Sequence, residues 1–209
     1  ILKLAKASKE HLDAAFKLKC KACDVTKPKP QSSKVSPPII QNYAFNKAVG
    51  IDVFDLHDAE GQCYLFLNIV CLGTDFQIVV LLCEGPGTPK SKQCGDAFMM
   101  SWVSWAGWPK DVRFDRGLHN RGYVSRMLGA HGICPHVVGL ESPQQIGKVE
   151  RKGDIWNKFA KRVIHQKHVT GEDEMRMLAF CNNTVINDGA RRGGFAPSQW
   201  VLGKYPRSV

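Results

Sequence analysis

Three strand-like segments in close succession constrain the fold of this 209-residue chain more than any other feature. Residues 47–57 (KAVGIDVFDLH), 64–72 (YLFLNIVCL) and 76–83 (FQIVVLLC) are rich in apolar residues, many of them β-branched or aromatic. Such residues favour strands. Asn68 and the turn sequence Gly73-Thr74-Asp75 interrupt the apolar region, and Gly85-Pro86-Gly87 ends it. The segments therefore predict an antiparallel meander.

After residue 90 the pattern alternates between helix and strand. Apolar spacing predicts helices over 90–107 and 120–131, and short strands over 111–114 and 135–140. A long helix follows over 145–168. Thr170 is placed to cap the last long helix, which Gly189 ends. The order β-β-β-α-β-α-β-α-α predicts an α/β domain.

The first 43 residues have a different composition. Residues 1–19 predict a basic amphipathic helix with Ser8 as its N-cap, and Cys20 and Cys23 form a CxxC pair. The segment VTKPKPQSSKVSPP at 25–38 has four prolines and three serines, which is typical of a semi-extended linker. We therefore expect a small N-terminal segment at 1–24, a linker at 25–43 and a core at 44–209. Because the chain starts without Met, we expect a fragment or a processed piece.

Charge and cysteine content narrow the function classes. The net charge of +10 is concentrated in residues 1–38 (nine Lys, three acids) and 146–209 (twelve basic residues, six acids). This pattern favours a polyanion partner, most simply nucleic acid; the alternative is a basic protein kept soluble by its charge. The irregular spacing of the eight Cys predicts a reducing environment. No apolar run approaches the ~18 residues of a membrane helix, so a membrane protein is not expected.

Three acids stand where separate elements could bring them together. Asp52 lies inside an apolar strand, Asp115 ends a short strand, and Glu150 lies in the first turns of a helix. Three converging carboxylates can hold two Mg²⁺ ions, which activate the attacking oxygen and stabilise the leaving oxygen of a phosphodiester. Each acid also has an ordinary interpretation: a turn or Lys partner for Asp52, a turn residue for Asp115, and a solvated acid for Glu150.

Four stretches in order resemble the integrases of retroviruses and long-terminal-repeat retrotransposons, particularly the gypsy-like elements. Residues 50–54 (GIDVF) resemble the strand with the first catalytic Asp, and 112–117 (VRFDRG) resemble the strand end with the second. Residues 142–151 (SPQQIGKVER) resemble the segment with the catalytic Glu. Residues 194–207 (GFAPSQWVLGKYPR) resemble the segment that closes the core in gypsy-type elements. Thirty-four residues separate Asp115 from Glu150, against about 35 in the family.

The resemblance implies a fold and a chemistry. The fold is an RNase H-like core, with a five-stranded mixed sheet flanked by helices. The activity is Mg²⁺- or Mn²⁺-dependent cleavage of element DNA, followed by attack of the new 3′-hydroxyl on target DNA, with Asp52, Asp115 and Glu150 as metal ligands and catalytic residues. It also implies a homo-oligomer, release from a polyprotein and action in the nucleus, after a possible cytoplasmic particle. The basic residues around Glu150 are then candidates for DNA binding, or else a solvated helix face: Lys148, Arg151, Lys152, Lys158, Lys161 and Arg162.

The CxxC pair resembles the second half of an integrase His-His-Cys-Cys zinc finger. Zinc needs four ligands, and residues 1–24 offer only His11 besides Cys20 and Cys23. The spacing of His11 does not match the family, so we interpret it as a solvated helix residue. We expect Cys20 and Cys23 to be zinc ligands in the full-length protein, together with residues upstream of Ile1.

Several features leave alternatives open. Ser142 and Asp154 depart from the family pattern. The negative charge of Asp154 disfavours DNA binding unless its side chain turns away or pairs with Lys158. His57 and His119 are candidates for the border of the active site, and the tryptophans are expected in the core. The chain is also compatible with an inactive or domesticated integrase-like DNA-binding or interaction module. A third interpretation is another RNase H-like nuclease or transposase.

Overall fold

The computed structural model describes residues 8–19, 44–114, 122–137, 143–189 and 194–203. The chain divides into two units, Ile1–Val35 and Ser36–Val209. The expected linker at 25–43 and the CxxC pair, Cys20 and Cys23, lie outside the described residues. The domain boundaries predicted from composition stay a prediction.

The described part of the N-terminal unit is one short helix, α1 (Lys9–Lys17). Ser8 is its N-cap, because the Ser8 hydroxyl accepts the backbone N–H of His11 at 3.3 Å. No residue of α1 is buried. His11 is exposed, with Nδ1 2.8 Å from Ser8 Oγ, as expected for a solvated helix residue.

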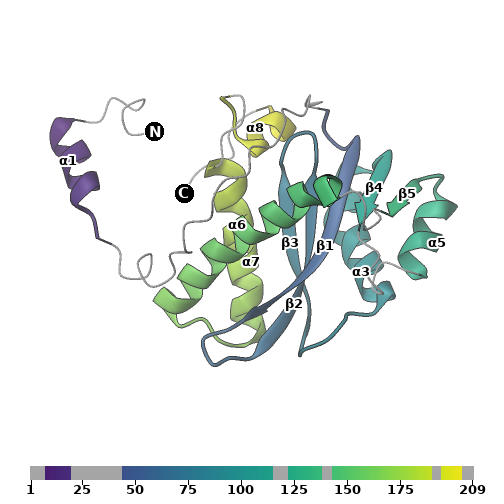
Figure 1. The fold of residues 1–209 in the computed structure, drawn as a ribbon, viewed down its shortest axis with the longest axis horizontal. Helices are drawn as coiled ribbons and strands as arrows, with labels where there is room; N and C mark the ends of the chain where they lie inside the picture. Colours follow the sequence, from purple (N-terminus) through teal and green to yellow (C-terminus); the bar gives the residue numbers. More distant parts are fainter. Residues whose placement is uncertain (1–7, 20–43, 115–121, 138–142, 190–193, 204–209) are drawn as a thin grey trace. The chain divides into compact units, whose positions relative to one another are not determined.

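The core unit is built on a mixed sheet with the order β3-β2-β1-β4-β5 (Figure 1). The first three strands pair antiparallel, which confirms the predicted meander, whereas β4 pairs parallel with both β1 and β5. The order follows from the connections, because tight turns join antiparallel neighbours and helical crossovers join parallel ones. The strands are β1 (Ala48–His57), β2 (Cys63–Cys71), β3 (Gln77–Glu84), β4 (Asp111–Phe114) and β5 (Cys134–Val137).

Helices cover both faces of the sheet (Figure 1). One face packs against α3 (Ser91–Phe98), the π-helix η1 (Met99–Val103) and α5 (Tyr123–Ala130), and α4 (Ser104–Ala106) continues η1. The other face packs against α6 (Pro143–Lys167) and α7 (Gly171–Gly189), while α8 (Pro197–Leu202) follows α7. No helix in the described ranges is both long enough and apolar enough to cross a membrane.

Successive side chains of a strand point to opposite faces of the sheet, so the strands contribute to two separate hydrophobic cores. Val49 and Ile51 of β1 join the core under α3 and α5, whereas Leu56 joins the core under α6 and α7. The strand β2, which lies between β3 and β1, is buried on both faces, which explains its continuous apolar sequence. Trp102 and Trp156 are fully buried, one in each core, as the sequence predicts, but Trp105 is 44% exposed.

Two asparagines of α7 form hydrogen bonds with backbone N–H and C=O groups on the outer edge of β3. The side-chain amide of Asn187 accepts the N–H of Gln77 at 2.9 Å and donates to its C=O at 2.7 Å. One turn earlier on α7, Asn183 makes the same pair of bonds to Val79, at 3.0 and 2.9 Å. The amides thus occupy positions that a further strand would take, which closes an edge otherwise open to aggregation.

We predict that Asn187→Leu lowers the free energy of unfolding by about 2–4 kcal/mol, because it leaves the buried N–H and C=O of Gln77 unpaired. Urea denaturation followed by circular dichroism measures the change. Thr184→Val, at an exposed position of the same helix, is the matched control and should stay within about 0.5 kcal/mol of wild type. Equal stability of all three proteins would show that these bonds contribute nothing.

Asp58 joins the β1–β2 turn to the start of α7. Its Oδ1 accepts the N–H groups of Glu60 and Gln62, both at 2.9 Å, and its Oδ2 accepts the Gly171 N–H at 3.1 Å. Burial alone raises the pKa of this carboxyl. The three N–H groups and the Tyr64 hydroxyl outweigh burial and hold the pKa below its ordinary value.

This lowered pKa predicts a pH-dependent stability. A carboxyl whose pKa is lower when folded stabilises the protein fully above its unfolded pKa of about 3.9, and this contribution is lost as pH falls through the folded pKa. Asp58→Asn should therefore be less stable than wild type at neutral pH, by about 1–3 kcal/mol. The difference should narrow toward about pH 3 in denaturation series. A difference that is constant with pH would contradict this role.

Candidate functional site

Asp52 lies in the middle of β1, the central strand of the sheet. Its side chain is half-buried, and its Oδ1 accepts the N–H of Val53 at 2.8 Å. Its cross-strand partner on β2 is Asn68. A carboxylate here would be costly among apolar neighbours alone. The polar residue opposite it on β2 makes this part of the sheet locally polar.

The α6 helix packs on the face of β1 that carries Asp52. Gly50 and Phe54, two residues before and after Asp52, share this face. A Cβ added to Gly50 would lie 2.2 Å from Val149 Cγ2, so α6 approaches β1 as closely as a glycine allows. Further along, the rings of Phe54 and Trp156 lie 5.6 Å apart between centroids. Figure 1 shows α6 crossing β1. The stretch of α6 from Val149 to Trp156 thus runs along the face of β1 from Gly50 to Phe54, and Asp52 lies between these two residues.

Glu150 belongs to this stretch of α6. It is exposed, whereas its neighbour Val149 is buried against the sheet. Asp115, the third predicted ligand, directly follows Phe114, the last residue of β4, and lies outside the described residues. β4 pairs with β1 through Gly50 and Arg113. The structure thus places the elements that carry Asp52 and Glu150 against each other, while the complete carboxylate site stays a prediction.

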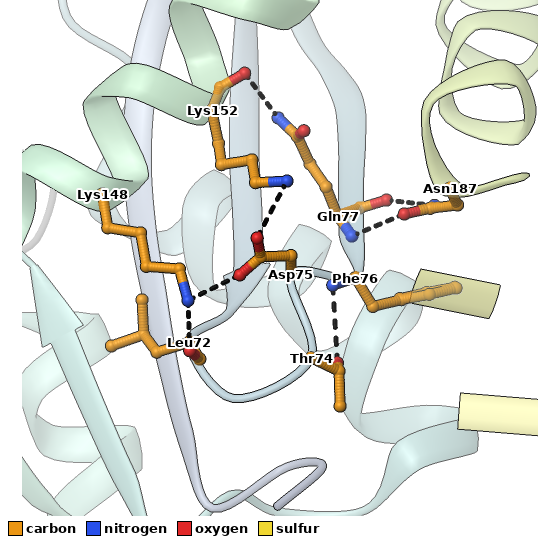
Figure 2. Close-up of polar contacts among 8 residues, drawn as sticks. All are labelled: Leu72, Thr74, Asp75, Phe76, Gln77, Lys148, Lys152 and Asn187. Carbon is orange, nitrogen blue, oxygen red and sulfur yellow. Dashed lines mark hydrogen bonds and ion pairs between the residues drawn. The ribbon is translucent and has the colours of Figure 1, made fainter. Parts of the chain in front are cut away.

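A buried amide pair, Asn68 and Gln77, joins the sheet to α6 beside Glu150. Asn68 Nδ2 donates to the C=O of Val149 at 3.2 Å. Gln77 Nε2 donates to Asn68 Oδ1 at 2.8 Å and to the C=O of Lys152 at 3.3 Å, the latter drawn in Figure 2. Both amides are fully buried. The two carbonyls that they bind flank Glu150, so the pair fixes the position of this part of the helix.

Lys148 and Lys152 hold α6 to the turn between β2 and β3 (Figure 2). Asp75 lies between them, with Oδ1 2.5 Å from Lys148 Nζ and Oδ2 3.3 Å from Lys152 Nζ. Lys148 also donates to the C=O of Leu72. The Asp75 side chain is 9% exposed, so solvent screens this pair of salt bridges weakly.

The six cations predicted to bind DNA therefore do not form one surface. At ~100° per residue, Lys148 and Lys152 lie on the flank of α6 away from Glu150, and they already have an acidic partner in Asp75. Of the others, three are exposed, and Arg162 lies over the Phe159 ring at 5.6 Å from its centroid. The exposed three are Arg151, Lys158 and Lys161. DNA binding by these residues stays a prediction.

Two other expectations can be compared with the described part of the chain. Asp154 is exposed, and no ion pair joins it to Lys158 among the residues that the structure describes. His57, a candidate for the border of the active site, does not share a face of the sheet with Asp52. It lies five residues after Asp52, an odd spacing that puts its side chain on the opposite face of β1. His119 lies outside the described residues.

The fold is that of retroviral integrase catalytic cores. A chain of the simian T-cell lymphotropic virus intasome, solved in complex with the PP2A regulatory subunit B56 gamma, is similar with a TM-score of 0.66 and 15% identity, over 100% of this chain and 73% of that one. The HTLV-2 integrase catalytic core domain, solved in complex with magnesium, is similar with a TM-score of 0.60 and 15% identity, over 74% of this chain and 95% of that one. The catalytic core domain of BIV integrase is similar with a TM-score of 0.57 and 13% identity, over 76% of this chain and 95% of that one.

These similarities show the fold of an integrase catalytic core, with a mixed sheet and flanking helices, as the resemblance of the four sequence stretches implies. No protein-family model and no curated protein matches the sequence. The likeness is therefore one of architecture.

We predict that Gly50→Ala displaces α6 from β1, because the new methyl group would overlap Val149 Cγ2. Overpacking of this kind costs about 1–3 kcal/mol of unfolding free energy. Gly50→Ala combined with Val149→Ala should recover part of that loss by removing the overlapping atom. Gly129→Ala, at a helical position with nothing within 4 Å, is the control and should be neutral or stabilising. A single Gly50→Ala variant as stable as wild type would contradict the close approach.

Proposed function

We propose that this chain is the catalytic core of a retroelement integrase, an enzyme that cuts element DNA and joins its 3′-hydroxyl to target DNA. One observation carries the proposal. In an integrase-like fold, the strand with Asp52 lies under the stretch of α6 with Glu150. Both residues also stand out in the sequence, through the stretches 50–54 and 142–151.

The donor set suits a hard divalent cation. Asp52, Asp115 and Glu150 all offer carboxylate oxygens, the ligands that Mg²⁺ prefers. Bound there, Mg²⁺ would activate the attacking oxygen and stabilise the leaving one. The similar HTLV-2 core was solved in complex with magnesium, which supports this assignment.

The chain's own contribution is to position these carboxylates. Val53 N–H holds one oxygen of Asp52, and the amide pair Asn68–Gln77 holds α6 at the level of Glu150. Of the six basic residues predicted around Glu150, Arg151, Lys158 and Lys161 are exposed and available for DNA phosphates. Phosphate contacts of this kind release counterions, so we expect DNA affinity to fall with salt.

The same proposal includes the lineage of the element, zinc binding, self-association and the site of action. The gypsy-like lineage rests on the four sequence stretches, and zinc binding by Cys20 and Cys23 rests on the CxxC pair that follows α1. Self-association is supported by the similar HTLV-2 cores, which were solved in dimeric and trimeric forms. Because integration acts on chromosomal DNA, we propose a nuclear site of action.

Two alternatives predict different activities. A domesticated, inactive integrase-like module would bind DNA or a partner without cutting. Another RNase H-like nuclease or transposase would use the same carboxylates but could cleave without joining. The presence of all three acids at the family spacing favours the active integrase.

The test is strand transfer of a labelled DNA end into a plasmid with Mg²⁺ or Mn²⁺. We expect wild type to join DNA, and Asp52→Asn, Asp115→Asn and Glu150→Gln each to reduce joining by about a hundredfold or more, because each removes a metal-binding charge. Asp154→Asn is the matched control, since it removes an exposed carboxylate one turn from Glu150 on the same helix. It should retain or increase joining.

The outcomes separate the alternatives. Cleavage without joining, lost in the same three variants, would favour the nuclease. Salt-sensitive DNA binding without any cutting, equal in all variants, would favour the inactive module. Joining that survives Glu150→Gln would reject the assigned site itself.

A further inference from the structure

A second group of metal-ligating side chains lies at the far end of the β1–β2 ladder. It consists of Asp55 and His57 on β1 and Cys63 on β2. Asp55 and His57 are two residues apart and so point to the same face, and Cys63 is the direct cross-strand partner of His57. The three share the face of Val53, which packs against the core under α3. Asp52 and α6 occupy the opposite face, so this group is separate from the proposed catalytic site.

The donor atoms are close enough to share one ion. One ligand atom from each residue lies within 4.8 Å of the other two. His57 Nδ1 and Asp55 Oδ2 are 3.7 Å apart. Tetrahedral zinc with bonds of about 2.0–2.3 Å places its ligands about 3.3–3.8 Å from one another. Small side-chain rotations would therefore bring all three atoms to the same ion.

A simple surface ion pair explains this geometry less well. At 3.7 Å the imidazole and carboxylate are too far apart for a hydrogen bond, and an exposed pair contributes little to stability. It also gives no reason for the Cys63 thiol beside them. Burial raises the pKa of this thiol, and the negative charge of Asp55 raises it further. A cation that binds this sulfur as a thiolate must displace its proton to solvent.

A cleft of about 360 Å³ adjoins the group. Asp55, His57 and Cys63 line it on one side, and the loop after β3 lines it on the other, through Pro86, Gly87, Thr88 and Pro89. Three protein ligands beside a cleft leave the fourth position of a tetrahedral ion open to water or another small ligand.

We propose that Asp55, His57 and Cys63 form a binding site for a borderline transition-metal ion, Zn²⁺ in particular. One sulfur, one nitrogen and one carboxylate oxygen suit zinc, whereas a thiolate does not suit Mg²⁺. The ion would join β1 to β2 beyond the end of the α3 core. This site is independent of the integrase assignment, because it shares no residue with the carboxylate set.

Cobalt is the probe, because Co²⁺ bound to a thiolate gives a charge-transfer absorption that oxygen-only sites lack. The full chain is used with Cys20→Ser and Cys23→Ser, so that the CxxC pair cannot contribute. We expect one Co²⁺ per chain with this absorption, displaced by Zn²⁺ and not by excess Mg²⁺. Cys63→Ser should abolish the absorption. His57→Gln, an exposed substitution that does not threaten folding, should weaken binding at least about tenfold.

Two control variants locate the signal. Cys181→Ser removes an exposed thiol on α7, and Asp52→Asn alters the opposite face of β1; both should bind Co²⁺ like the parent. The proposal is overturned if the parent chain shows no thiolate absorption. It is equally overturned if the absorption survives Cys63→Ser, or if His57→Gln binds Co²⁺ as tightly as the parent.

Discussion

The hydrogen bonds from Asn68 and Gln77 to α6 are the interaction on which the candidate site depends. Apolar packing of α6 around Trp156 sets its distance from the sheet, but such contacts are non-directional and tolerate sliding along the helix axis. Bonds to the carbonyls of Val149 and Lys152 are directional, and breaking them would leave buried amides unpaired. They therefore specify where along the sheet Glu150 stands. Asp75 adds a second constraint at the same turns by binding Lys148 and Lys152.

This anchoring also redistributes charge. Asp75 lies in the β2–β3 turn with a positive φ of 65°, a conformation that aspartate tolerates better than most residues. Because it forms salt bridges with Lys148 and Lys152, the solvent-exposed positive charge of α6 lies at other positions, such as Arg151, Lys158 and Lys161. A basic helix is thus divided into an internal flank that supports the fold and an external surface that faces solvent.

Local signals in the sequence predicted most of the elements, while the site residues themselves stay a prediction. Ser8, Thr170 and Gly189 marked helix boundaries correctly. The apolar segment 47–57 predicted the strand β1, which carries Asp52. The pairing of Lys148 with Asp75 could not be read locally, because the partners are 73 residues apart and meet only when α6 lies on the sheet. Asn68 was visible as a polar break in an apolar run, but its partner Gln77 was not. The position of His57 on the face opposite Asp52 follows from the sequence alone, since an odd spacing within a strand reverses the face.

The two faces of β1 explain how one strand can serve two kinds of chemistry. Gly50, Asp52 and Phe54 face α6, where close packing at Gly50 and the neighbouring amides hold the helix that carries Glu150, and the ligands proposed there are carboxylate oxygens. Asp55 and His57 face the other way and extend past the core under α3, where solvent and a softer thiol ligand are available. The pleat keeps the two sets apart, because successive residues alternate between the two faces of the sheet. The two proposed sites would therefore select different ions, since their ligand types differ.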